Sequence, residues 1–197
     1  MSSNLLALRL PGRTEIALSF EQPIGRIWLR GLARVMEYAT EFRRREVSIS
    51  RVTPQLSVGG SFTADQIPDL TARGITAVVD CRSERSDDAA LLAEAGVQLY
   101  RLHTRDKFAP EYATLRAAVD WVSDHLARGG HVYIHCEHGV GRAPLLASAT
   151  LVAHGHSAGD ALRMVRSARW QALPNDRQLH ALRMFEVHIR HGGAEAA

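Results

Sequence analysis

The sequence has few cysteines and no long apolar run. Its two cysteines, Cys81 and Cys136, are too few for the disulfide framework of a small secreted domain. No apolar run reaches the length of about 18 residues that a membrane-spanning helix needs. The first residues lack the basic region and the apolar core of a secretory signal. We therefore expect no disulfide framework, no membrane-spanning helix and a cytoplasmic location.

The chain also has no large excess of positive or negative charge. The formal net charge is +3 at pH 7, and Lys107 is the only lysine among 24 Lys and Arg residues. Basic and aromatic residues do not interleave along the chain as they do in nucleic-acid-binding surfaces, so we expect no nucleic-acid partner. The mild basic excess suits an anionic substrate, although solubility explains it equally well.

The composition is that of a globular protein, with 46% hydrophobic and 23% charged residues in a chain of 197. This length fits one domain with an extension. We expect an amino-terminal extension over residues 1–46, a main domain over residues 47–190 and a short tail over residues 191–197.

The extension carries two local patterns. The stretches LLALRL and TEIALSF flank PGR, which favours a short hairpin. Over residues 24–45, apolar side chains recur every three or four positions and arginines gather at the end, which predicts an amphipathic helix. A helix packed on the main domain is the first interpretation. Peripheral membrane contact through residues 24–45 is the alternative.

Strands and helices alternate along the main domain. The apolar stretches ITAVVDC, VQLYRLH and HVYIHC are typical of strands, and segments between them, such as residues 110–130, have helical periodicity. This alternation predicts an α/β fold with a central, mostly parallel sheet of about four or five strands and helices on both faces. Ligands of such sheets bind at the carboxyl ends of the strands, and Cys136 lies at one of these ends.

The segment HCEHGVGRAP joins the last of these strands to a helix. Gly139 and Gly141 allow the loop to curl so that successive amides face inward and bind an anion. The helix that follows adds unpaired N–H groups, and Arg142 adds a planar fork that matches two phosphate oxygens. The same field favours a thiolate over a thiol at Cys136. A thiolate beside a bound phosphate predicts covalent phosphoryl transfer.

Such a reaction needs an acid for the leaving oxygen. Asp106 lies in a polar loop 30 residues before Cys136, after a strand that ends at the same edge of the sheet. It could protonate the leaving group and then accept a proton from the attacking water. Glu111 is the weaker candidate, because it opens the next helix and suits the helix dipole there.

These residues resemble the signature of the cysteine-dependent protein tyrosine phosphatases, in which a His-Cys pair is followed by five residues and an Arg. The stretch VYIHCEHGVGRAP resembles the signature loop, RDKFAP the acid loop, and RVTPQLSVGGSF the opening strands of the dual-specificity branch. The resemblance extends over roughly residues 47–190. It implies that this segment is a phosphatase catalytic domain that works through a cysteinyl-phosphate.

The resemblance also implies roles for single residues. Cys136 would be the nucleophile, Arg142 the phosphate-binding cation and Asp106 the general acid. His135 would orient the loop and Gln178 would position water; a satisfied core histidine and a surface glutamine are the alternatives. The substrate phosphate would also be bound by the loop amides, which belong to Glu137, His138, Gly139, Val140, Gly141 and Arg142. This chemistry needs no metal and no other cofactor.

Two positions bear on turnover and substrate. Many relatives carry Ser or Thr directly after the Arg, where this chain has Ala143, which puts the rate of cysteinyl-phosphate hydrolysis in question. Glu137 places an acidic group beside the pocket, which disfavours a multiply phosphorylated headgroup. A phosphorylated protein is therefore the preferred substrate, with phosphotyrosine alone or also phosphoserine and phosphothreonine open. A phosphoinositide or other phospholipid headgroup is the alternative.

Cys81 ends another strand of the sheet. In some lipid phosphatases of the family a similarly placed cysteine forms a reversible disulfide with the nucleophile, so Cys81 is a candidate redox partner of Cys136. A buried small hydrophobe is the first interpretation. We interpret Arg82 and Glu84, close behind it, as salt-bridged surface residues.

Three other functions stay open at this point. A sulfurtransferase also uses a cysteine loop at a strand end, but it needs no acid upstream. A metal site would draw on His131, His135, Cys136 and His138, although the alternation of side chains along a strand makes joint ligation awkward. A phosphate-binding pseudophosphatase usually lacks the Cys, the Arg or the Asp, and all three are present here.

Overall fold

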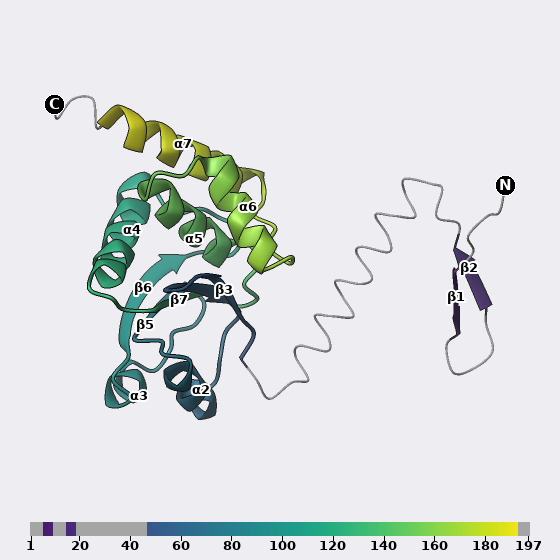
Figure 1. The fold of residues 1–197 in the computed structure, drawn as a ribbon, viewed down its shortest axis with the longest axis horizontal. Coiled ribbons are helices and arrows are strands. Elements are labelled where there is room, and N and C mark those ends of the chain that lie inside the picture. Colours follow the sequence, from purple (N-terminus) through teal and green to yellow (C-terminus); the bar gives the residue numbers. More distant parts are fainter. Residues whose placement is uncertain (1–5, 10–14, 19–46, 193–197) are drawn as a thin grey trace. The chain divides into compact units, whose positions relative to one another are not determined.

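The structure is a computed structural model that describes residues 6–9, 15–18 and 47–192 (Figure 1). It divides into two units, Met1–Arg45 and Glu46–Ala197. The helix predicted over residues 24–45 lies outside the described residues, as does most of the predicted tail.

The described part of the first unit is a β-hairpin. Strand β1 (Leu6–Arg9) pairs with β2 (Glu15–Leu18) in antiparallel register, with Leu6 opposite Leu18. The hairpin predicted around PGR is therefore confirmed.

The second unit is built on a five-stranded mixed sheet (Figure 1). Its strands in chain order are β3 (Ile49–Thr53), β4 (Leu56–Gly59), β5 (Ala77–Arg82), β6 (Gln98–Thr104) and β7 (Val132–His135). Their order across the sheet is β3-β4-β7-β5-β6, with β3 antiparallel to β4 and the other neighbours parallel. The prediction of a mostly parallel sheet is confirmed, and the strand before Cys136 lies at its centre.

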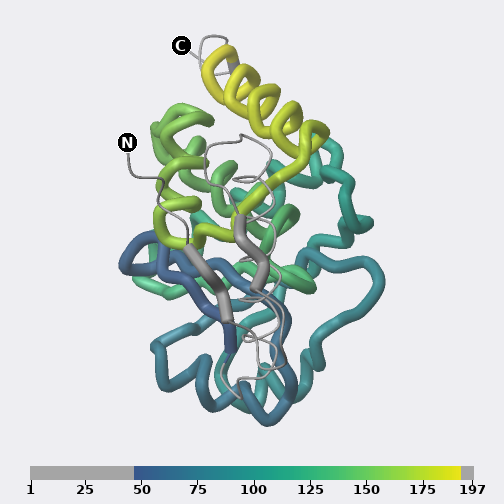
Figure 2. The backbone as a smooth tube through the Cα atoms, turned by 90° about the vertical axis from the view of Figure 1, so that its right-hand side faces the viewer, coloured from purple at the N-terminus to yellow at the C-terminus, as the bar shows by residue number. Residues whose placement is uncertain are grey.

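Helices cover both faces of this sheet, as the sequence predicts (Figure 1). One face carries α2 (Ile67–Ala72), which follows the short 3-10 helix η1 (Ala64–Gln66), and α3 (Ala89–Glu94). The other face carries α4 (Tyr112–Ala127), α5 (Arg142–Ala153), α6 (Ala158–Ala168) and α7 (Asp176–Gly192). Figure 2 shows the layers from the side, with the yellow α7 far from the blue segments around α2.

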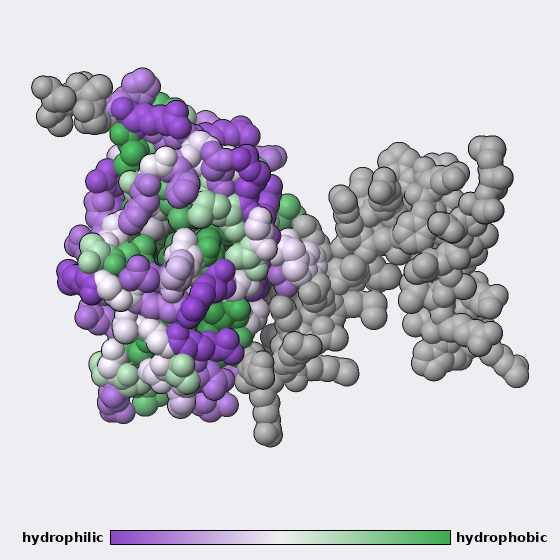
Figure 3. Space-filling view, viewed as in Figure 1, coloured by the Kyte–Doolittle hydropathy of each residue, from purple (hydrophilic) through white to green (hydrophobic). Residues whose placement is uncertain are grey.

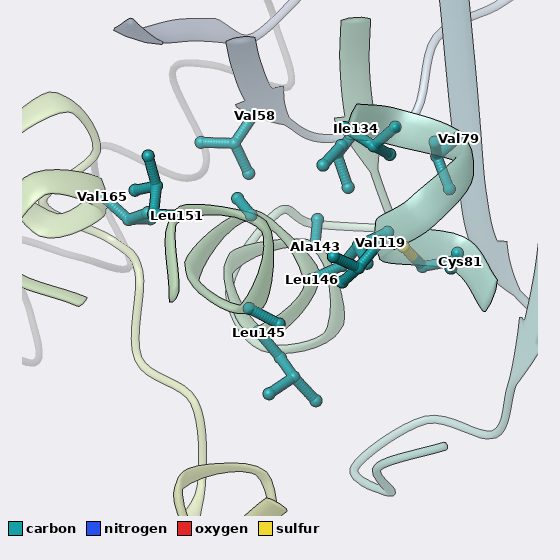
Figure 4. Close-up of a cluster of buried hydrophobic side chains, with 14 of the residues drawn as sticks. Val58, Val79, Cys81, Val119, Ile134, Ala143, Leu145, Leu146, Leu151 and Val165 are labelled. Carbon is teal, nitrogen blue, oxygen red and sulfur yellow. The ribbon is translucent and has the colours of Figure 1, made fainter. Parts of the chain in front are cut away.

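The central strands β5 and β7 begin with apolar residues because their side chains alternate between two cores. Val78 of β5 and Tyr133 of β7 belong to the core with α2 and α3. Val79 and Ile134, the next residues along each strand, belong to the larger core with α4 to α7 (Figure 4). A strand buried on both faces needs such an apolar run, and buried polar residues appear only towards the carboxyl ends of these two strands.

Helix α5 is buried on nearly every side. Figure 4 shows Ala143 and Leu146 close to Val119 of α4, and Leu151 close to Val165 of α6. Since the helix is surrounded by packed side chains, its first turn cannot shift without repacking the core. That first turn carries Arg142.

The surface of the second unit mixes polar and apolar residues, and hydrophilic residues cover much of the face seen in Figure 3. Within the described ranges, no helix combines the length and the hydropathy that crossing a membrane requires.

Candidate active site

Cys136 lies where the central strand ends and the loop begins. It follows β7 directly and is 3% exposed, and the amide of Gly139 donates a hydrogen bond to its Sγ over 3.3 Å. Helix α5 starts at Arg142, with Gly141 as its N-cap. The structure thus brings together the predicted nucleophile, the glycine loop and a helix N-terminus.

The carbonyls of the loop point away from Cys136 and into the scaffold. The acceptors and their donors are Glu137 O with the Ser61 amide (3.1 Å), His138 O with Arg169 Nη2 (2.9 Å), Gly139 O with Arg169 Nε (2.9 Å) and Val140 O with the Leu173 amide (2.7 Å). Because a trans peptide is planar, an outward carbonyl turns the N–H of the next residue inward. The amides of residues 138–141 therefore face the inside of the loop, as an anion-binding nest requires.

Two glycines of the loop have no room for a side chain. Gly139 has a φ of +67°, and a Cβ on it would lie 2.4 Å from the carbonyl carbon and oxygen of Gly59. A Cβ on Gly141 would lie 2.7 Å from Gln178 Oε1. The loop is packed so closely against the backbone of β4 that position 139 needs glycine, whereas a Cβ at position 141 would require the Gln178 side chain to move.

The Arg142 guanidinium is held by its neighbours but keeps a donor for a ligand. Glu84 accepts from Nη1 and Nη2 over 2.8 and 2.7 Å, and the Thr104 carbonyl accepts from Nη1 over 3.0 Å. Nε finds no acceptor in the described part of the chain, although Arg142 is only 4% exposed. Nε and Nη2 form the edge of a guanidinium that binds two phosphate oxygens side by side.

Asp106 lies at the same guanidinium. Its Oδ1 is 3.3 Å from Arg142 Nη2, and its side chain is 65% exposed. Both residues line an open pocket of about 340 Å³, whose other lining residues are Ser83, Glu84, Arg105, Glu137 and His138. The predicted acid therefore stands at the mouth of the loop. Glu111, the weaker candidate, is the N-cap residue of α4 and does not line this pocket.

The loop that carries Asp106 is anchored at the start of α7. Asn175 Nδ2 donates to the Lys107 carbonyl over 2.8 Å, and Gln178 Nε2 donates to the Phe108 carbonyl over 3.1 Å. Gln178 is 2% exposed, so its alternative interpretation as a surface glutamine is wrong. Its amide lies between the acid loop and Gly141, while its role in positioning water stays a prediction.

His135 is fully buried beneath the loop. Its Nε2 lies 2.7 Å from Asp87 Oδ2, a carboxylate in the segment between β5 and α3. Nδ1 has no partner within the described ranges. The histidine is thus a core residue with a charged partner. Sequence analysis missed Asp87, since nothing in its local pattern connects it with a residue 48 positions away.

The interpretation of Arg82 as a surface residue is wrong. Arg82 is 5% exposed, and its guanidinium contacts Asp80 at 2.8 Å, Asp87 at 2.6 Å and Glu137 at 3.3 Å. A buried guanidinium is stable only with such compensation. Glu84 is salt-bridged as expected, but its partner is the phosphate-binding candidate Arg142, so it belongs to the site.

Arg142 also changes the electrostatics of the pocket. Its hydrogen bonds lower the pKa of Glu84 to about 2, which keeps that carboxylate ionised at neutral pH. Burial lowers the pKa of His138, and the positive charge of Arg142 lowers it further. At neutral pH the imidazole therefore adds no positive charge to the mouth of the pocket.

Arg169 is a second supporting residue that sequence analysis missed. It is the C-cap of α6 and 3% exposed, and besides its two bonds to the loop it donates from Nη1 to Ser48 Oγ and Ser50 Oγ. It ties the signature loop to β3. An arginine at a helix end is typical of dipole pairing, so its position alone gave no signal of this role.

Cys81 is buried in the core beside α4 (Figure 4). Burial raises the pKa of its thiol, and the charge of Cys136 raises it further. Both cysteines are free thiols. This environment suits the interpretation of Cys81 as a small hydrophobe, and a redox partnership with Cys136 stays a prediction.

The four residues considered for a metal site are not brought together. His131 precedes β7, and its Nε2 lies 2.8 Å from Ser57 Oγ, while His135 and Cys136 are at the other end of the strand. A different group, Asp80, Asp87 and His135, has ligand atoms within 4.8 Å of one another. The guanidinium of Arg82 already bridges these two carboxylates, so the cluster is an ion-pair network.

Comparisons with known proteins agree with this geometry. A family model described as "Polymorphic toxin system, DSP-PTPase phosphatase" matches residues 56–156. Dual specificity phosphatase 28 of Mus musculus is 32% identical over 131 residues, which cover 64% of this chain and 76% of that protein. Protein tyrosine phosphatase PRL-1 of Leishmania major is 30% identical over 137 residues, which cover 65% and 76%.

Solved structures show the same fold. The crystal structure of PTPMT1 matches with a TM-score of 0.70 at 23% identity and covers 75% of this chain and 99% of that chain. The structure of PTPMT1 in complex with PI(5)P matches with a TM-score of 0.69 at 24% identity.

Proposed function

This chain belongs to the dual-specificity-like branch of the cysteine-based protein tyrosine phosphatase superfamily, and on that premise we propose that it hydrolyses phosphomonoesters in proteins through a cysteinyl-phosphate. We assign this activity to a catalytic domain formed by residues 47–190. We also propose that the protein acts in the cytoplasm. The observation that carries the proposal is Arg142 Nε, a buried donor without an acceptor among the described residues, beside a loop whose amides face inward. A bound phosphate would accept hydrogen bonds from Arg142 Nε and from the loop amides.

In the first step, the thiolate of Cys136 attacks phosphorus and the bond from phosphorus to the ester oxygen breaks. Arg142 and the amides of residues 138–141 bind the three non-bridging oxygens, over which the charge of the transition state is spread. Asp106 gives its proton to the leaving oxygen, so the alcohol departs neutral.

In the second step, water attacks the cysteinyl-phosphate. The Asp106 carboxylate accepts a proton from the water, the sulfur–phosphorus bond breaks, and Cys136 returns as a thiolate. Ala143 offers no hydroxyl to assist this departure. We therefore expect the second step to limit turnover, with an initial burst of released alcohol.

The charges at the pocket mouth favour a substrate with a single phosphate. Three carboxylates, those of Glu84, Asp106 and Glu137, line it together with the guanidinium groups of Arg105 and Arg142. Once a phosphate occupies Arg142 and Asp106 holds the proton that it transfers, the other two carboxylates still outnumber the guanidinium of Arg105 among these groups. This excess of negative charge disfavours a second phosphate on the same molecule. This supports phosphotyrosine in a protein as the substrate, with phosphoserine and phosphothreonine next.

A phospholipid headgroup is the second candidate. The fold likeness to PTPMT1, one structure of which contains PI(5)P, is the observation in its favour. In that case residues 24–45 would supply the membrane contact.

The first experiment measures phosphate release, with a metal chelator present, from a phosphotyrosine peptide, a phosphothreonine peptide, a phosphoinositide and phosphatidylglycerophosphate. The Cys136→Ser variant is the blank. We expect Cys136-dependent turnover of the phosphotyrosine peptide to be fastest. Faster turnover of a lipid would support the second candidate, and no turnover of any substrate would favour a phosphate-binding module.

The role of Asp106 is tested by the leaving group. We expect Asp106→Asn to lower kcat/KM, which reports the first step, by about 10²–10⁴-fold with a phosphotyrosine peptide, because the poor leaving group then departs unprotonated. The loss should be much smaller with p-nitrophenyl phosphate, whose leaving group is stable as an anion. Equal losses with both substrates would remove Asp106 from the role of acid.

A further inference from the structure

The signature loop is held from one side by a short segment that takes no part in the proposed reaction. This segment, Asp80–Asp87, runs from the end of β5 into the loop before α3. Its contacts with the signature are Asp87 with His135 (2.7 Å), Arg82 with Glu137 (3.3 Å) and Glu84 with Arg142 (2.7 Å). Three residues of one signature are thus fixed by one stretch of chain.

Arg82 is the centre of this support. It donates from Nε to Asp80 Oδ1 over 2.8 Å and from Nη2 to Asp87 Oδ1 over 2.6 Å. Asp80 also accepts from the backbone amides of Arg82 and Asp87, which closes the segment into a rigid turn. The other oxygen of Asp87 reaches His135, and Nη1 of Arg82 reaches Glu137. One continuous chain of charges therefore ends on the two residues that flank Cys136.

On the basis of the function proposed above, we propose that Arg82 and Asp87 are positioning residues, which clamp His135 and Glu137 and thereby set the place of the Cys136 thiolate. His135, Asp87 and Arg82 are nearly inaccessible, at 0, 8 and 5% exposed, so this part of the clamp is shielded from water, while Glu137 at its other end is partly exposed. Packed apolar side chains would fill this space at a lower desolvation cost than buried charges. Hydrogen-bonded ion pairs, however, fix the orientation of the side chains that they join. Orientation matters here because displacing a nucleophile by about 1 Å lowers the rate about a hundredfold.

The experiment compares Asp87→Asn, Glu137→Gln and the double variant. Both replacements keep the side-chain shape, and each removes one end of the clamp. The readouts are kcat and KM with p-nitrophenyl phosphate, and the rate at which iodoacetate alkylates Cys136 in the free enzyme, followed by mass spectrometry. Asp120→Asn is the matched control, because it breaks an exposed ion pair with Arg116 on α4.

We expect each single variant to lower kcat/KM, which reports attack by the thiolate, about tenfold or more and to slow alkylation of Cys136. Because both changes act through Arg82, the double variant should lose little more than the worse single variant. The control should match the parent chain in both readouts.

Alkylation and turnover at the parental rate in both single variants would overturn the proposal. Losses that multiply in the double variant and follow the unfolded fraction, measured by thermal melting, would also overturn it, because they would show a purely structural role. If the parent chain hydrolyses no phosphomonoester, the proposed function fails. The alkylation rates, which need no turnover, still decide on the clamp.

Discussion

The signature loop and the segment that supports it work by different physical means. Residues 136–142 act through the backbone, with carbonyls turned outward, amides turned inward and glycines where no Cβ fits. Asp80–Asp87 acts through charged side chains, whose partners lie 48 to 58 positions further along the chain. The loop thus relies on its backbone for the proposed binding of an anion, and the proposed positioning of the loop relies on ion pairs between residues far apart in the sequence.

The largest effect is expected from a substitution that displaces the backbone of the signature loop. Gly139→Ala would push a Cβ to 2.4 Å from the backbone of Gly59, so the loop must move as a whole. We expect kcat/KM for p-nitrophenyl phosphate to fall by about a hundredfold or more. Activity close to that of the parent chain would show that the amides need no such close packing.

The matched control for this change is Gly155→Ala. Gly155 also has a positive φ, of +95°, but a Cβ there meets nothing within 4 Å. We expect a loss of about 1–2 kcal/mol in the free energy of unfolding and unchanged kinetics. A lower kcat/KM in this variant would mean that backbone strain far from the loop is enough to impair catalysis.

A smaller effect is expected where a side chain supports the backbone. Arg169→Met removes the donors of two loop carbonyls, and each unsatisfied buried carbonyl costs about 1–3 kcal/mol. We expect weaker binding of inorganic phosphate, by about tenfold, together with a lower Tm. Arg163→Met, which breaks only the exposed ion pair with Asp160, should change neither property. Phosphate affinity equal to that of the parent would show that the loop keeps its shape without Arg169.

The smallest effect is expected from removing one charge of the Asp80–Asp87 segment. Glu84→Gln keeps the shape of the side chain but removes the charge that holds Arg142, and Glu84 is partly exposed, at 41%. We expect kcat/KM to fall by only about two- to fivefold, the range of an exposed ion pair. A loss as large as that of Gly139→Ala would contradict the division between backbone and charge.

The same variant has a predictable pH dependence. Hydrogen bonds from Arg142 lower the pKa of Glu84 from its ordinary value near 4.5 to about 2 in the folded chain. A group whose pKa is depressed on folding stabilises the protein above its unfolded pKa and loses that contribution as pH falls through its folded pKa. The difference in Tm between the parent chain and Glu84→Gln should be full at pH 7 and shrink between pH 4.5 and 2. A constant difference across this range would contradict the pairing.

The sequence predicted those features that depend on neighbouring residues. The alternation of apolar stretches with helical segments predicted the parallel sheet, since a strand buried on both faces is largely apolar. The spacing of Cys136, the glycines and Arg142 predicted a loop between a strand and a helix, because the strand end, the glycines and the helix start lie within a few positions of one another. The partners of the loop carbonyls, Ser61, Arg169 and Leu173, lie elsewhere in the chain. The hairpin around PGR followed from local pattern as well.

Side-chain partners far apart in the sequence were beyond such prediction. Arg82 looked like a surface arginine, because local pattern does not show that Asp80, Asp87 and Glu137 surround it. Local pattern gave no sign of the role of Arg169 for the same reason, since its partners are the carbonyls of residues 138 and 139. Burial of a charge is decided by what other elements bring to it, and that information is spread over the whole chain.

By itself, the sequence determined the alternation of strands and helices along the chain and the position of the proposed phosphate-binding loop. Apolar periodicity and glycine positions act over a few neighbouring residues, so both features can be read locally. Only the tertiary structure decided how that loop is oriented. Asn175, just before α7, and Gln178 of α7 anchor the acid loop. Arg82, Asp87 and Glu84 contact Glu137, His135 and Arg142, respectively. Ion pairs and hydrogen bonds act only over a few ångströms of space, and folding alone brings these groups that close.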